Sequence, residues 1–289
     1  MRRTFLAAAA AAAATALIMS TVGIGSRSAP VENRSAAAVS GALVDLTYRF
    51  NARTIYWPTA KRFRLTVVAH GHTAGGFFYA ANNYEAAEHG GTHVDSPIHF
   101  ARGRRTTDEI PLRHLVGSAV VIDVSNRAAA NRDYLVSPGD FRRWEQANGR
   151  IPRRSIVLLR TGWGRFWPNA ERYMGTADRG EDAVPNLHFP GLHPRGARWL
   201  VRNRDVKAVG IDTASIDYGQ STLFRTHQIL GAANVPVFEN LANLDRLPLR
   251  GFSVVALPMK IDRGTGGPLR AIAVLGGAPA GGRLAGGAG

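Results

Sequence analysis

The stretch from His89 to His99 constrains this chain more than any other part of its sequence. It reads H-G-G-T-H-V-D-S-P-I-H, so three histidines and an aspartate fall close together. Zinc and manganese accept imidazole nitrogen and carboxylate oxygen readily, and the chain has no cysteine to offer instead. The spacing predicts a divalent-metal site built from His89, His93 and Asp95. The alternative is a turn with exposed histidines.

The same segment is predicted to be a loop rather than a helix. Gly90 and Gly91 destabilise helices, and Pro97 lacks the amide hydrogen that a helix interior needs. A loop entered from residues 78–88 can bring His89 and its neighbours to one centre. The two oxygens of Asp95 can then bridge two ions.

A second set of possible ligands lies within residues 225–241. His227 begins a short helical pattern, and Glu239 ends an apolar run that is typical of a buried strand. A buried carboxylate needs a partner, and a metal ion would supply one. The alternatives are a histidine that caps the helix and a glutamate paired with one of the many arginines.

Together these two segments resemble the metal-dependent cyclase family, which includes bacterial kynurenine formamidase and isatin hydrolase. The family pattern H-x-G-T-H-x-D-x-P-x-H is met in full from His89 to His99. The family's later histidine and glutamate correspond to His227 and Glu239. The resemblance spans residues 44–274, with an apparent insertion near residues 165–190.

The resemblance implies a role for each matching residue. It implies one or two divalent ions, zinc or manganese, with Asp95 bridging when there are two. His99 would donate and accept protons, and Trp57 would contact the substrate unless it is a core or surface residue. The implied metal ligands are His89, His93, Asp95, His227 and Glu239.

Such a centre predicts hydrolysis of a carbon–nitrogen bond. A divalent ion lowers the pKa of bound water and polarises a carbonyl, while a histidine such as His99 can protonate a leaving nitrogen. No G-x-S-x-G motif supports a serine nucleophile, and the lack of cysteine excludes a thiol. We expect an enzyme that hydrolyses a small cyclic or aryl amide. The alternatives are a cyclase or dehydratase of the same family acting on a polyketide-like substrate, and a non-enzymatic exported protein that binds metal or polyanions.

The N-terminus has the form of a signal peptide. Residues 1–29 begin with Arg2-Arg3 and continue with an alanine-rich apolar stretch. The motif R-R-T-F-L fits a twin-arginine signal, with the general secretory route as the alternative. The stretch is short and weakly hydrophobic, so we expect no stable membrane anchor. Cleavage is expected between residues 29 and 38, which predicts a periplasmic or secreted protein.

Length and charge predict one enzyme domain. After a linker at residues 30–42, residues 43–275 suit a single domain, and the Gly/Ala-rich residues 276–289 are predicted to be disordered. The net charge is +15, but the arginines are scattered, which favours a solvated surface over a nucleic-acid site. We expect a small-molecule substrate, no nucleic-acid partner and a homodimer.

The pattern of segments predicts an α/β fold. Strands outnumber helices, so we expect a mixed sheet with a few covering helices, and the resemblance implies a barrel-like sheet. The clearest helix is at residues 138–147, with Ser137 as N-cap and Gly149 beyond the end. The other predicted helices are 194–203 and 227–232, and the predicted strands are 43–48, 64–69, 119–124, 155–160, 208–212, 235–239, 252–257 and 271–275.

Overall fold

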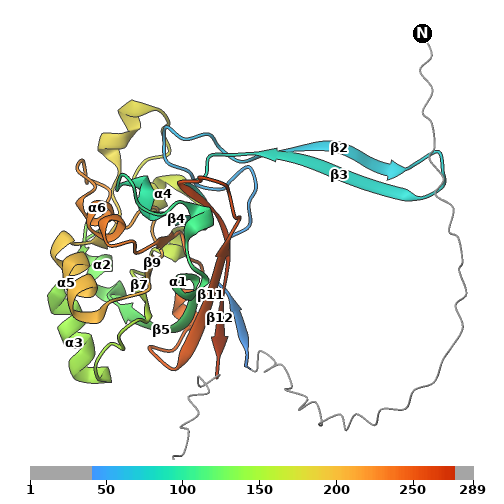
Figure 1. Cartoon of the computed structure of the whole chain (residues 1–289). Helices are drawn as coiled ribbons and strands as arrows, with labels where there is room; N and C mark the ends of the chain where they lie inside the picture. Colours follow the sequence, from blue (N-terminus) through green and yellow to red (C-terminus); the bar gives the residue numbers. More distant parts are fainter. Residues whose placement is uncertain (1–40, 277–289) are drawn as a thin grey trace, which may run out of the picture. The chain divides into compact units, whose positions relative to one another are not determined.

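The computed structural model describes residues 41–276, so the predicted signal peptide, most of the linker and the C-terminal tail lie outside the described residues. Eight strands form one mixed sheet in the order β1-β12-β11-β5-β7-β9-β10-β4 (Figure 1). Strand β4 also pairs with β12, so the strands from β12 to β4 close into a ring that β1 extends. The predicted α/β fold with a barrel-like mixed sheet is confirmed. The strands are β1 (Leu43–Asp45), β4 (His93–Asp95), β5 (Val116–Asp123), β7 (Ile156–Arg160), β9 (Ala208–Ile211), β10 (Val237–Glu239), β11 (Phe252–Pro258) and β12 (Gly266–Leu275).

Two apolar layers hold this ring. Strand side chains alternate between faces, so Val121 and Leu158 fill the interior while Val120 points outward. The outward layer packs against helices through residues such as Phe141 and Leu200. Burying a side chain of this size stabilises the fold by about 1.5–3 kcal/mol, so both layers matter. The helices are α1 (Leu112–Leu115), α2 (Ser125–Ala130), α3 (Pro138–Asn148), α4 (Ala170–Met174), α5 (Pro194–Arg204) and α6 (Arg225–Ala232).

The ends of α3 follow the sequence prediction. Ser137 accepts from the backbone of Asp140, whose side chain in turn accepts from the Ser137 backbone amide, which forms a capping box. Gly149 ends the helix at φ 78°, a conformation that a residue with a Cβ atom adopts with strain.

The histidine motif is not the plain loop that the sequence predicts, and the run that leads into it is a strand. Residues Phe78–Glu85 form β3, which pairs antiparallel with β2 (Arg64–His72). His93–Asp95 is strand β4, held between β10 and β12. Pro97–His99 is a 3-10 helix in which Pro97 takes the first position, where no amide hydrogen is needed. For β4, ladder partners far away in the sequence therefore override the local glycine signals.

The β2–β3 hairpin, hereafter the arm, extends away from the ring (Figure 1). Its two strands form a separate two-stranded sheet, as do the short strands β6 (Leu135–Val136) and β8 (Gly191–Leu192). Among residues 41–276, no helix is long and apolar enough to cross a membrane.

The apparent insertion at residues 165–190 folds around α4 and two 3-10 helices, Trp163–Phe166 and Glu181–Asn186. It forms an aromatic cluster around Tyr173 and Phe189, against which Trp57 packs. The guanidinium of Arg179 donates to the Trp57 carbonyl oxygen at 2.9 Å. The insertion thus supports the segment that carries Trp57.

Candidate active site

Strand register brings the two distant ligand segments together. In β4, His93 and Asp95 lie two residues apart and so point to the same face. Strand β10 runs antiparallel to β4 with Glu239 opposite His93. Side chains that face each other across such a pair lie close together. The prediction that residues around 90 and 239 meet is therefore explained by one pairing of short strands.

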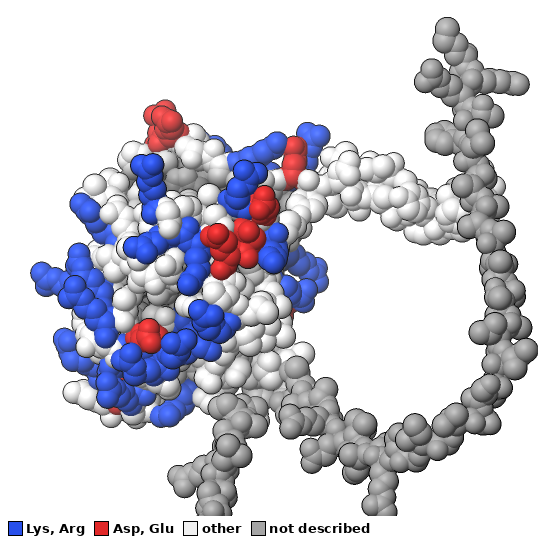
Figure 2. Space-filling model, viewed as in Figure 1, with Lys and Arg blue, Asp and Glu red and all other residues white. Residues whose placement is uncertain are grey.

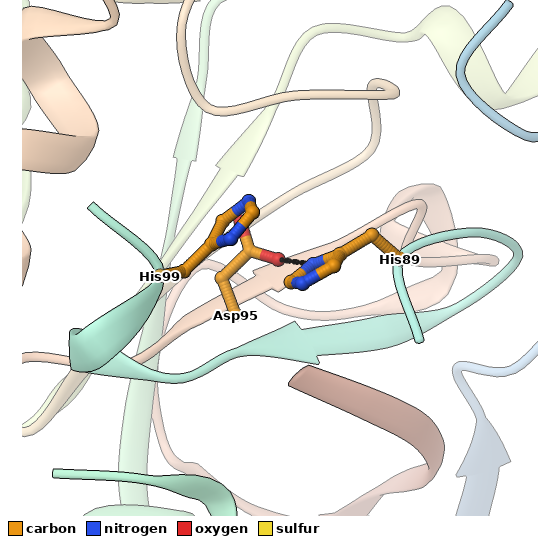
Figure 3. A group of neighbouring side chains, drawn as sticks. All are labelled: His89, Asp95 and His99. Atoms are coloured by element: carbon orange, nitrogen blue, oxygen red, sulfur yellow. Dashed lines mark hydrogen bonds and ion pairs between the residues drawn. The ribbon is translucent and has the colours of Figure 1, made fainter. Parts of the chain in front are cut away.

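Asp95 lies at the centre of the group. One carboxylate oxygen lies 2.6 Å from Nδ1 of His89 and 3.2 Å from Nε2 of His93. The other oxygen lies 2.8 Å from Nε2 of His227. Figure 3 shows the Asp95 carboxylate and the His89 ring pointing toward one another. Asp95 is only 4% exposed, so these imidazoles take the place of solvent around it.

Glu239 completes the group from β10. Its carboxylate oxygens lie 3.2 Å from Nε2 of His227 and 3.6 Å from Nε2 of His93. The backbone amide of Ile216 donates to it at 2.6 Å. The structure thus brings together all five predicted ligands, counting His89 and Asp95.

The pKa values of the two buried carboxyl groups shift in opposite directions. Burial raises the pKa of Glu239, and the negative charge of Asp95 raises it further. Burial alone would also raise the pKa of Asp95, but His89, His227 and His93 hold it well below its usual range. Burial alone would lower the pKa of His227, but its bonds to Asp217, Asp95 and Glu239 raise it well above the ordinary value. Two buried carboxylates that draw protons onto imidazole form a donor set that a divalent cation would satisfy.

The outer nitrogen of each imidazole is already occupied. His227 Nδ1 lies 2.7 Å from Asp217, His93 Nδ1 lies 2.9 Å from the Gly91 carbonyl oxygen, and His89 Nε2 lies 2.9 Å from the Thr265 hydroxyl. This leaves one nitrogen of each ring facing Asp95. Metal-binding histidines are commonly fixed in this way, because the outer bond sets both tautomer and ring orientation.

Two of the residues that bond these outer nitrogens, Asp217 and Thr265, are not predicted from the sequence. Asp217 accepts hydrogen bonds from the backbone amides of Thr226 and His227 as well as from the His227 ring. Thr265 donates to Glu88 at 2.5 Å. The signal for Asp217 was a carboxylate shortly before a ligand histidine at a helix start. No local pattern points to Thr265, which precedes β12.

His99 occupies a different position from the other histidines. Its ring stacks on His89 with centroids 3.8 Å apart and lies 6.0 Å from the ring of His227. Burial lowers the pKa of His99 to about 4, with the charge of Asp95 opposing the shift and that of His89 adding to it. The imidazole is therefore neutral at neutral pH and able to accept a proton.

Two overlapping donor sets fit a cation. His93, Asp95 and Glu239 offer one set, and His89, Asp95 and His99 offer the other, with the ligand atoms of each set within 4.8 Å of one another. Asp95 belongs to both, which suits a bridging carboxylate. His99 is thus placed where it can act either as a ligand or as a proton carrier.

A cavity of about 250 Å³ opens over this group. Trp57, Phe100 and Phe224 form an aromatic wall, with Trp57 edge-on to Phe224 at 6.1 Å. The two phenylalanines were not singled out from the sequence. The volume is below the usual range for drug-sized ligands, so the cavity suits a small, flat, apolar molecule.

Comparisons with known proteins identify the family of this chain. The family model described as putative cyclase matches residues 44–218. This chain belongs to that family. The curated isatin hydrolase of Roseibium aggregatum is 31% identical, with 71% of this chain and 78% of that protein covered. The kynurenine formamidase of Salinibacter ruber is 28% identical, with 80% and 96% covered.

The solved structures give the same result. Isatin hydrolase A from Ralstonia solanacearum has a TM-score of 0.73 and 32% identity, covering 81% of this chain and 92% of that one. The predicted family and the predicted class of enzyme, a hydrolase, are confirmed by these matches. His227 and Glu239 lie beyond the residues that the family model matches, so their place in the site rests on the geometry.

Proposed function

We propose that this protein is a metal-dependent hydrolase of a small cyclic or aryl amide. The observation that carries the proposal is the convergence of five ligand side chains, with Asp95 at their centre, at the base of an aromatic cavity. The ligands would be His89, His93, Asp95, His227 and Glu239. They would hold one or two ions, with zinc or manganese suited to this mixture of imidazole and carboxylate.

In the proposed reaction, different residues of the chain transfer the proton and position the substrate. A bound divalent ion supplies an acidified water and polarises the amide carbonyl. His99 takes one proton from the attacking water and returns it to the leaving nitrogen, so that the carbon–nitrogen bond breaks to give an amine and a carboxylic acid, which then releases its proton to solvent. Trp57 and Phe224 hold the aromatic part of the substrate flat in the cavity and exclude water.

The relatives' names and the cavity support the proposed substrate class. Isatin hydrolase and kynurenine formamidase both indicate an amide next to an aromatic ring. The wall of Trp57, Phe100 and Phe224 suits such a ring. Cyclisation of a larger polyketide-like substrate fits the small cavity less well.

A metal and substrate screen tests this proposal. The purified chain is analysed for metal, stripped with a chelator and reloaded with zinc or manganese. Hydrolysis is then measured on isatin, on formylated kynurenine and on a simple ester. We expect hydrolysis of at least one aryl amide that is lost on stripping and restored on reloading. Full activity without metal would overturn the proposal.

We also propose that the protein is exported. The support is the Arg2-Arg3 start and the alanine-rich stretch within residues 1–29. The native protein should begin between residues 30 and 39 and lie in the periplasm or outside the cell. Replacing both arginines by lysine should block export if the twin-arginine route is used. A native protein that retains Met1 would contradict export by a cleaved signal.

A further inference from the structure

A second cavity lies at one end of the barrel-like sheet, apart from the metal-ligand group. Strands β5, β7 and β9 run parallel to one another, and the cavity opens where these strands end. Arg160 is the last residue of β7, Asp212 follows β9, and Ser125 begins the helix after β5. The cavity has a volume of about 500 Å³. Folds built on parallel strands commonly bind ligands at the carboxyl ends of those strands.

A wall separates this second cavity from the cavity over the metal ligands. Among the described residues, the two cavities share no lining residue. Ala214 and Asn240 line the first cavity, whereas their near neighbours Asp212 and Leu241 line the second. The hydroxyl of Tyr173 lies 3.0 Å from both the Asp212 carbonyl oxygen and the Asn240 side-chain oxygen, and so joins the two segments of the wall. A ligand in the second cavity would therefore not touch the metal ligands.

Two guanidinium groups of the second cavity keep unused hydrogen-bond donors. Arg160 is ion-paired with Asp123 through Nη1, but its Nε is buried and has no partner. A buried donor without a partner is costly, so the chain satisfies this guanidinium only in part. Arg165 lies over the ring of Phe166 at 4.6 Å, and within residues 41–276 no carboxylate forms an ion pair with it. The second cavity therefore has a cationic side.

The second cavity also holds an unpaired carboxylate. The side chain of Asp212 is already used, because it accepts hydrogen bonds from the amides of Thr161 and Gly162 at 2.8 and 2.9 Å. Asp245 forms no ion pair with any cation in the described part of the chain. Burial raises the pKa of Tyr48, and the negative charges of Asp212 and Asp245 raise it further. Asp245 thus faces the side of the cavity that Tyr48 forms.

The remaining wall is apolar, and the molecule around it is cationic. Ala129, Leu241 and Leu244 line the cavity beside Tyr48, whose ring stacks on that of Trp167 at 4.2 Å. The net charge of the chain is +15, and Figure 2 shows many more Lys and Arg than Asp and Glu side chains on the viewed face. Such a surface raises the local concentration of anions. A small anion with an apolar part therefore suits this cavity.

We propose that the second cavity binds a small amino carboxylate, with its carboxylate against Arg160 and Arg165 and its amino group toward Asp245. An anion without an amino group leaves Asp245 unpaired, and an amine without a carboxylate leaves Arg165 unpaired. A molecule that carries both groups gives each side a charge-assisted hydrogen bond, which is stronger than a neutral one.

Two kinds of molecule share this chemistry. One is a free amino acid. The other is an amino-substituted aromatic acid, which is the class of product that opening a cyclic aryl amide releases. The second source rests on the proposed function, whereas the first does not.

Calorimetric titration of the full chain with its metal tests this site. The probes are leucine and 2-aminobenzoate, together with benzoate, which lacks the amino group, and aniline, which lacks the carboxylate. The site variants are Arg165→Gln and Asp245→Asn. The matched control is Arg172→Gln, because Arg172 also lies over Phe166 at 4.6 Å but does not line the cavity. Circular dichroism verifies that each variant is folded.

We expect leucine or 2-aminobenzoate to bind the wild type, and each site variant to weaken that binding about 10-fold or more, as for loss of a charged hydrogen-bond partner. The control should bind like the wild type, and benzoate and aniline should bind at least about 10-fold more weakly. Binding of leucine alone would assign the site to free amino acids, and binding of 2-aminobenzoate alone would assign it to the aromatic acid.

Three results would overturn the proposal. The first is that neither amino carboxylate binds. The second is binding that both site variants leave unchanged, which would place the ligand elsewhere on the chain. The third is benzoate binding as tightly as 2-aminobenzoate, which would make the cavity a site for anions in general. Because the titration needs no turnover, its outcome is independent of whether the protein hydrolyses an amide.

Discussion

The metal-ligand group and the arm differ in what they bury and what they expose: the group buries charged side chains, and the arm exposes apolar ones. In the group, two carboxylates are buried and the ligand atoms are paired with one another or with neighbouring residues, several of them from distant parts of the chain. In the arm, apolar side chains are exposed and each strand bonds to its neighbour along the sequence. The polar atoms of the ligand group are thus paired within the chain, whereas the arm presents apolar side chains at the surface.

This difference predicts how each region responds to substitution. Removing one member of the ligand group leaves a buried charge without its partner, which is costly. Replacing one residue of the arm changes only a solvated surface in the monomer. The expected effects therefore decrease from the centre of the site to the arm.

The largest effect is expected for Asp95→Asn. The amide cannot neutralise a cation and adds donors where Asp95 now faces three imidazoles. We expect loss of bound metal and fall of turnover to background, measured by metal analysis and an amide-hydrolysis assay. Asp140→Asn, a buried carboxylate in the α3 capping box, is the control and should retain metal. An Asp95→Asn protein with normal metal content would contradict the central role of this carboxylate.

His99→Ala should separate proton transfer from metal binding. We expect turnover to fall by roughly 10²–10⁴-fold while metal is retained, which is typical for loss of a general acid–base group. His114→Ala, a histidine bonded to the Lys207 carbonyl outside the site, should leave turnover unchanged. Equal loss of metal and turnover would make His99 a ligand, as its place in the second donor set allows.

Asp217→Asn should weaken metal binding without removing any ligand. The neutral amide holds His227 less firmly, and loss of such an outer partner typically lowers metal affinity about 10–100-fold. The matched control is Asp212→Asn, a buried aspartate bonded to the turn at Thr161 and Gly162. That variant should lose stability but keep its metal affinity. Equal affinities in the two variants would show that Asp217 serves only the fold.

The smallest effect is expected on the arm. Val67→Thr should change the free energy of unfolding by less than about 0.5 kcal/mol in dilute solution, because Val67 is 64% exposed. Leu158→Ala, inside the ring, should cost about 2–5 kcal/mol. Urea denaturation at low protein concentration compares them. A comparable cost at both positions would mean that the arm packs on its own chain.

The features that could be predicted from the sequence are those that depend on short sequence patterns. The histidine motif, the caps of α3 and most strands of the ring follow from spacing and alternation. Strand β3 was missed because Ala-Ala-Asn-Asn at its centre lacks alternation, and its hydrogen bonds come from β2. Thr265 was missed because its role depends on the contact between residues 89 and 265, which no short pattern encodes. Long-range register, rather than propensity, decides such positions.

The closure of the ring has a consequence for the order in which the protein is made. Strand β4 carries two ligands and lies between β10 and β12, and β12 ends at Leu275, near the close of the described chain. Chains fold from the N-terminus as they are synthesised, but β4 cannot be enclosed until its last neighbour has left the ribosome. The motif at residues 89–99 is therefore translated early and becomes a binding site late. A nascent chain that stops before Gly266 holds every ligand and still has no finished site.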